Sequence, residues 1–201
     1  MESSKPHMPQ STESSRERIL REATRLFATF GYHATGMKDL ERATGLGRSS
    51  LYYQFPSKES VLFEIITSYL RELIAYGSGL LATEMPAEQR LRLLSRAVMR
   101  CIMTNQEAMT VCFREVHSVT CERRDELLSL HRQYEQVWMD VVKAGVNEGI
   151  CRDAGHLGVK ALLGMHHYSY LWLRQDGALP PEQIADTFCD LILKGLETEH
   201  G

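Results

Sequence analysis

The segment best suited to chemistry is GLGRSSLYYQF, residues 45–55, which combines small polar residues, an arginine and two adjacent tyrosines. Neighbouring helical positions point in different directions, so one short helix cannot bury both Tyr52 and Tyr53. We therefore expect at least one phenol to contact something outside its own domain. Arg48 at the start of the segment carries a guanidinium that can bind guanine or phosphate.

Two short helices around a glycine turn should position these side chains. Helical spacing of apolar residues predicts one helix at about 37–44 and a second at 48–54, separated by a Gly-Leu-Gly turn. This order is typical of a helix-turn-helix, whose second helix enters the major groove of DNA. Small polar residues in the first turn of that helix let its backbone approach the bases.

The remainder of the chain is also predicted to be helical. Apolar residues recur at helical spacing from 14 to 30. A long helix capped by Ser57 follows the motif, and we expect a kink or break at the glycines of residues 76–79. Further helices are expected at about 87–105, 107–119, 124–148, 156–174 and 181–197. Strand patterns are nearly absent. We therefore predict an all-α fold of about nine helices.

Composition narrows the function classes. The chain has 201 residues, is 43% hydrophobic and carries a net charge of -3, but residues 1–60 hold nine Lys and Arg against seven acids. This asymmetry favours an N-terminal segment that faces an anion. No catalytic motif and no Cys-x-x-Cys pair is present, so we expect neither an enzyme nor a metal site. The scattered cysteines and the absence of a signal peptide or membrane span predict a cytoplasmic protein.

The stretch RILREATRLFATFGYHATGMKDLERATGLGRSSLYYQFPSKESVLFEII resembles the DNA-binding domain of the TetR family of transcription regulators. The resemblance covers about a quarter of the chain. It implies a three-helix helix-turn-helix domain at 14–60 and a larger helical domain for ligand binding and dimerisation at 61–201, after a disordered segment or tag remnant at 1–13. The DNA contacts that it implies are Thr35, Gly36, Lys38, Arg48, Ser49, Ser50, Tyr52, Tyr53, Gln54 and Lys58.

A regulator of this family is expected to bind a pseudo-palindromic double-stranded operator as a homodimer. The segment LGVKALLGMHHYSYLWL is apolar almost all round, and such a helix must be covered on several sides. In a chain of this size a second subunit can supply part of the cover. We therefore expect the helices at 156–174 and 181–197 to form the dimer interface.

A small hydrophobic effector should release the DNA, without any further cofactor. Its candidate contacts are aromatic, soft or adaptable residues of 87–175: Met103, Met109, Phe113, His117, Tyr134, Trp138, Met165, His166, His167 and Tyr168. The C-terminal run looks like relatives that sense fatty-acyl or aryl CoA thioesters. A lipophilic cation paired with Glu107 or Glu115 is one alternative effector. A thiol redox sensor using Cys101 or Cys112 is another possibility.

Overall fold

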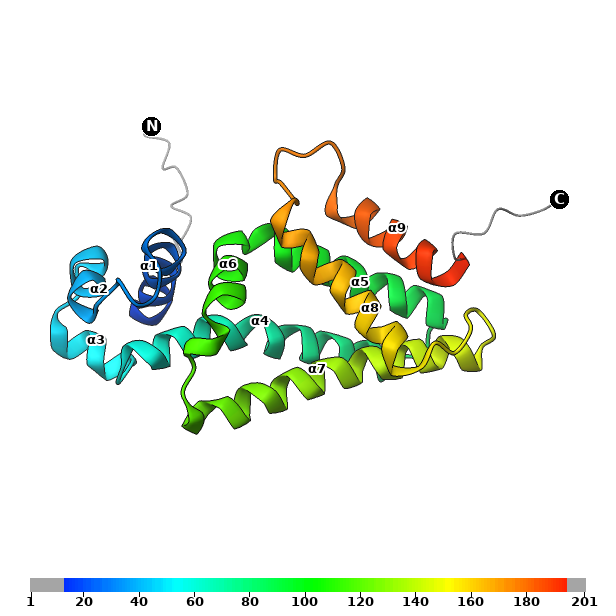
Figure 1. Ribbon diagram of the computed structural model, residues 1–201, viewed down its shortest axis with the longest axis horizontal. Helices are drawn as coiled ribbons and strands as arrows, with labels where there is room; N and C mark the ends of the chain where they lie inside the picture. The colour runs from blue at the N-terminus through cyan, green and yellow to red at the C-terminus, as the bar shows by residue number, and fades with distance from the viewer. Residues whose placement is uncertain (1–12, 195–201) are drawn as a thin grey trace, which may run out of the picture.

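The computed structural model describes residues 13–194, and every regular element in that range is a helix (Figure 1). The expected disorder of residues 1–12 lies outside the described residues. The helices are α1 (Ser15–Phe30), α2 (Met37–Thr44), α3 (Arg48–Gln54), α4 (Lys58–Leu81), α5 (Ala87–Thr104), α6 (Gln106–Glu115), α7 (Cys121–Asn147), α8 (Gly155–Tyr168) and α9 (Pro181–Lys194). Short 3₁₀ turns, η1 (Val116–Ser118) and η2 (Ser169–Leu171), follow α6 and α8.

Helices α1, α2 and α3 form a compact group at one end of the molecule, as Figure 1 shows. Ser14 caps α1, because its hydroxyl accepts the Glu17 N–H at 3.2 Å and the Glu17 carboxylate accepts the Ser14 N–H at 2.8 Å. Gly45 ends α2 with a φ of 67°, a left-handed conformation that glycine adopts without strain. The bounds of α2 and α3 are those expected from the sequence.

Helix α4 is continuous for 24 residues, so the break predicted as one outcome at residues 76–79 is wrong. Gly77 instead allows α4 to lie close against α7. A Cβ atom at position 77 would come 2.3 Å from Val137 Cγ1 and 3.3 Å from Leu94 Cδ1. The glycine therefore serves close packing, which the sequence cannot distinguish from a helix break.

The larger part of the molecule is built around α4 and α7, which lie alongside each other, while α5 packs against α4 and α9 (Figure 1). Its core contains Leu94, Val98, Met99, Trp138 and Leu162, all with no exposed surface. Two expected helices end early in 3₁₀ turns: α6 ends at Glu115 and α8 at Tyr168. None of the helices described here is both long and apolar enough to cross a membrane.

The contact of α4 with α7 predicts opposite effects for two neighbouring substitutions. Gly77→Ala should overpack the contact with Val137, at a cost of about 1–3 kcal/mol that exceeds the gain in helix propensity. Gly79→Ala is the matched control, because a Cβ atom there would meet no other atom within 4 Å and alanine favours a helix by about 1 kcal/mol. Thermal denaturation should show a lower midpoint for Gly77→Ala and an equal or higher one for Gly79→Ala. Equal midpoints for the two variants would contradict the close contact.

Candidate nucleic-acid interface and effector site

Helix α3 presents its polar residues and both tyrosines to solvent. Its first turn carries Arg48, Ser49 and Ser50, all exposed. Tyr53 is 86% exposed and Tyr52 37%, whereas Leu51 and Phe55 are 0% and 2% exposed and anchor the helix inward. The Tyr52 ring lies under the Arg48 guanidinium at 5.4 Å, an arrangement that directs this cation along the outer face. The resulting surface has hydroxyl and guanidinium donors suited to a polyanion.

The remaining predicted nucleic-acid contacts are divided between the surface and the interior. Lys38 is exposed, Gln54 is half-buried, and the Gly36 N–H already donates to Asp39 Oδ2 at 2.8 Å. Thr35 is only 3% exposed, and its hydroxyl donates to the Gly31 carbonyl at 2.9 Å. In this conformation the Thr35 side chain closes the turn after α1.

Lys58 holds the same turn from the start of α4. Its ammonium donates to the carbonyls of Tyr32 and Thr35, both at 2.8 Å, and lies 4.2 Å from the centre of the Tyr32 ring. Partial burial lowers the pKa of this amine. The amine predicted to contact phosphate is thus engaged within the domain, and it fixes the turn that leads into α2.

A polar joint, formed by Glu59, Glu115 and Ser118, connects this turn to the larger helical part. Glu115 Oε1 accepts the Tyr32 N–H at 3.3 Å, and Glu115 Oε2 accepts the Ser118 hydroxyl at 3.0 Å. Glu59 Oε1 accepts the N–H and hydroxyl of Thr120 at 2.9 and 2.7 Å, which caps α7 from the start of α4. Sequence analysis missed this joint, since the partners lie more than 50 residues apart.

Four of the predicted effector residues meet between α6, α7 and α8. The ring of Tyr134 lies 6.5 Å from Trp138 and 5.7 Å from His167, centre to centre. Phe113 lies 6.1 Å from His167 and stacks on Tyr170 at 4.3 Å. Tyr134 and Trp138 are 2% and 0% exposed, while Phe113 is 40% exposed. The group therefore extends from the surface into the core.

The other predicted effector residues occupy different environments. Met109 is 1% exposed, Met103 and Met165 are half-buried, and all three pack within the hydrophobic core. His117 lies exposed on η1. Tyr168, 66% exposed, faces outward from the end of α8. The three methionines therefore share the core with Tyr134 and Trp138, whereas His117 and Tyr168 lie at the surface.

His166 is tied into the core between α5, α8 and α9. Its Nδ1 lies 2.8 Å from the Leu162 carbonyl, which can only accept, so Nδ1 carries the proton and donates. Nε2 therefore accepts from the Ser95 hydroxyl at 2.6 Å. Burial lowers the pKa of His166 to about 4, and burial next to His166 lowers the pKa of His167 to about 4 as well. Both imidazoles are neutral at pH 7.

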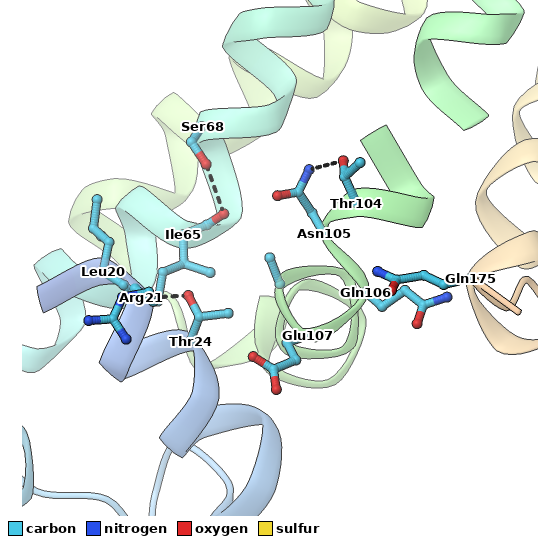
Figure 2. A pocket seen from close by; sticks show the side chains of 11 residues that line it. Leu20, Arg21, Thr24, Ile65, Ser68, Thr104, Asn105, Gln106, Glu107 and Gln175 are labelled. Atoms are coloured by element: carbon cyan, nitrogen blue, oxygen red, sulfur yellow. Dashed lines mark hydrogen bonds between the residues drawn. The ribbon is translucent and has the colours of Figure 1, made fainter. Parts of the chain in front are cut away.

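A cleft of about 580 Å³ lies elsewhere, between α1, α4 and the turn from α5 to α6 (Figure 2). It is lined by Leu20, Arg21, Thr24, Ile65, Ser68, Thr104, Asn105, Gln106, Glu107, Ala108 and Gln175. None of the predicted effector residues lines it. Glu107, proposed above as an anion for a cationic effector, is exposed at this cleft.

The cysteines do not support the redox alternative. Burial raises the pKa of Cys101 to about 11 and that of Cys112 to about 12. Reactive sensor thiols instead have lowered pKa values, because the thiolate is the nucleophile. Among the residues the structure describes, no group of three His, Cys, Asp or Glu is placed to hold a metal ion.

Comparison with known proteins gives two family matches. Residues 19–65 match the model of bacterial regulatory proteins of the tetR family, and residues 84–196 match the tetracyclin repressor-like C-terminal domain. The HTH-type transcriptional repressor KstR2 of Rhodococcus jostii is 29% identical over 188 residues, 92% of each chain.

Two solved structures extend the comparison. The TetR family transcriptional regulator PfmR of Thermus thermophilus is 34% identical, with a TM-score of 0.81 over 90% of this chain and 100% of that one. AibR, solved in complex with isovaleryl coenzyme A and operator DNA, shares the fold at a TM-score of 0.77 and 23% identity, over 90% of this chain and 98% of that one.

The two buried histidines predict a stability that depends on pH. An unfolded imidazole binds its proton near pH 6.5, but the folded ones do so near pH 4, so between these values the unfolded state holds more protons. The free energy of unfolding should therefore fall as the pH is lowered from 7 to 5, by about 2 kcal/mol per histidine. Urea denaturation at the two pH values measures this loss.

His166→Gln should remove about half of the loss, and His117→Gln, at an exposed position, serves as the control for deleting a histidine. Equal stability of the parent protein at pH 7 and pH 5 would show that these imidazoles are not held neutral by burial.

Proposed function

Since the chain belongs to the TetR family of bacterial transcription regulators, we propose that it is a cytoplasmic repressor that binds a pseudo-palindromic operator as a dimer and releases it when a small effector binds. The observation that carries this proposal is the outer face of α3. Arg48, Ser49 and Ser50 occupy its first turn, and Tyr53 is almost fully exposed beside them. A soluble scaffold has no need of this surface, whereas a recognition helix requires it.

Each DNA-facing residue takes a role suited to its geometry. Arg48, Ser49 and Ser50 reach base edges, while Tyr52, Tyr53 and Gln54 donate to phosphates. Lys38 adds a cation. Gly36, which has no side chain, lets the backbone at the start of α2 approach the DNA. Thr35 and Lys58 support this surface from inside, through the turn that they hold together.

The dimer is formed by α8 and α9. Helix α8 and the η2 turn that follows it carry an exposed stripe at intervals of three and four residues, which places its members near one face. The stripe consists of Leu157, Ala161, Gly164, Tyr168 and Leu171. Leu157 and Leu171 are 77% and 57% exposed, and Trp172 beside them is 46% exposed. Apolar side chains in such a row are suited to burial against a second copy.

The effector is a CoA thioester with a fatty-acyl or aryl group rather than a lipophilic cation. A carboxylate strengthens the binding of a buried cation, but the one beside the aromatic group, Glu135, already faces His156 Nε2 at 2.6 Å and Lys160 Nζ at 3.2 Å. Glu115 is only half-buried and is bonded to Tyr32 and Ser118. The structure of AibR with isovaleryl coenzyme A shows that this fold can hold a CoA thioester.

Effector binding alters DNA affinity through the polar joint. The effector side of the joint is α6 and η1, which carry Glu115 and Ser118, and the DNA side is the turn at Tyr32. An effector that displaces α6 changes the position of Glu115 and therefore strains the turn before α2. The effector must bind the DNA-incompetent conformation more tightly, since only a difference in affinity shifts the equilibrium.

Substitutions on α3 test the DNA-binding role. A duplex selected by the protein from a random library serves as the probe in fluorescence anisotropy. Arg48→Ala should weaken binding about 10- to 100-fold and relax base preference, and Tyr53→Ala should weaken binding to all sequences alike. Tyr76→Ala removes a tyrosine of α4 that is 38% exposed and should bind like the parent. Unchanged binding by both α3 variants, with helical content intact, would refute the assignment of α3.

Leu157→Glu tests the dimer. A carboxylate in an apolar interface must be desolvated, so the dissociation constant of the dimer should rise about 10- to 100-fold. Leu128→Glu places the same charge on α7, where the leucine is 43% exposed, and should leave the dimer intact. Sedimentation velocity over a range of concentrations measures both. A parent protein that is monomeric at micromolar concentration would rule out the dimer.

A further inference from the structure

We propose that the side chains of Tyr134, Trp138 and His167 form a recognition point inside the effector site for a hydrogen-bond-accepting oxygen, as in the carbonyl of an acyl thioester. This inference rests on the proposed function and goes further by stating which atom of the effector the protein reads.

Each of the three side chains has a buried polar atom without a hydrogen-bond partner of good geometry, although Trp138 Nε1 lies near the Tyr134 hydroxyl. These are the Tyr134 hydroxyl, Trp138 Nε1 and His167 Nε2. A buried polar group without a partner loses its hydration and gains nothing in return. Trp138 and His167 each contact the ring of Tyr134, so the three polar atoms lie in one part of the core. A ligand that meets them would restore the lost hydrogen bonds.

The three groups share one region because of helix geometry. Tyr134 and Trp138 are four residues apart and lie on the same face of α7, with ring centres 6.5 Å apart. His167 comes from α8, and its ring lies 5.7 Å from that of Tyr134. In contrast, His166 has both ring nitrogens bonded, to Leu162 and Ser95. Of the two adjacent histidines, His167 therefore has the nitrogen available for a ligand.

The chemistry of the three groups selects an acceptor. An indole N–H can only donate, a phenol hydroxyl donates readily, and a neutral imidazole offers one N–H. Burial keeps His167 neutral at pH 7, so the cluster carries no charge of its own. The carboxylate nearest along α7 is that of Glu135, and its buried Oε1 already faces His156 Nε2 at 2.6 Å and Lys160 Nζ at 3.2 Å. An oxygen with lone pairs fits this arrangement, and an ammonium group does not.

Phe113 provides the route to the cluster. Its ring is 40% exposed, stacks on Tyr170 and touches His167 edge-on at 6.1 Å. A partly exposed ring thus lies against His167, at the edge of the cluster. Movement of this ring would admit an acyl chain into the core and leave a bulky carrier group outside. In a thioester the carbonyl lies where the acyl chain meets the carrier. Its oxygen would therefore lie beside the polar groups of Tyr134, Trp138 and His167.

The test compares ligands that differ in a single oxygen. Decanoyl-CoA and its thioether S-decyl-CoA share the chain and the carrier, but only the first has the carbonyl. Isothermal titration with full-length protein should give a dissociation constant about 10- to 100-fold lower for decanoyl-CoA.

In Tyr134→Phe this preference should shrink toward unity. Without ligand, the same variant should melt at an equal or higher temperature, because it loses a buried hydroxyl that has no partner. Tyr76→Phe, which alters an exposed tyrosine, should keep the preference.

The panel also contains decanoic acid, 2-dodecanone and decyltrimethylammonium. These compounds separate the proposal of a recognition point from the proposal of a CoA thioester effector. Equal affinity of the parent for thioester and thioether would overturn the recognition point while leaving a CoA effector in place. Binding of the acid or the ketone but of no CoA compound, lost in Tyr134→Phe, would support the recognition point and overturn the thioester effector. Binding of the cation alone, or of nothing in the panel, would overturn both.

Discussion

The ammonium of Lys58 is the contact on which the placement of the recognition helix depends. It binds the two carbonyls of the turn between α1 and α2, so it joins the first residue of α4 to the segment that orients α2 and α3. Glu115 binds the N–H of Tyr32 in the same turn from the effector side. The turn is therefore held from two sides, by Lys58 of α4 and by Glu115 of α6. A change in either contact alters the position of α3.

Local signals predicted the helix-turn-helix well. The bounds of α2 and α3 follow from the glycines between them and from apolar residues at helical spacing. Family membership confirms the all-helical fold and a regulator that is not an enzyme. The break expected in α4 was wrong because a glycine in a helix has two physical uses. It can interrupt the helix, or it can let another helix approach, and only the position of Val137 decides between them.

The proposed effector site was harder to predict, because residue type does not separate a core from a pocket. Phe113, Tyr134 and His167 come from three helices, and Met109 and Met165 are equally soft and apolar but belong to the hydrophobic core. What distinguishes Tyr134, Trp138 and His167 from these methionines is a buried side-chain polar atom without a hydrogen-bond partner, a property of the folded chain alone. Similarly, the sequence marks Lys58 as a cation near DNA, but it does not show the carbonyls that occupy its amine.

The continuity of α4 has a mechanical consequence. At 1.5 Å per residue, its 24 residues span about 36 Å, and Gly77 lies about 28 Å from Lys58. The tight contact at Gly77 can act as a fulcrum, since the backbone there has no room to slide against α7. Simple lever arithmetic then gives a displacement of roughly 2.5 Å at Lys58 for a tilt of about 5°. A hydrogen bond to a base edge tolerates far less than that, so we expect an unbroken α4 to convert a small angular change into loss of register on DNA.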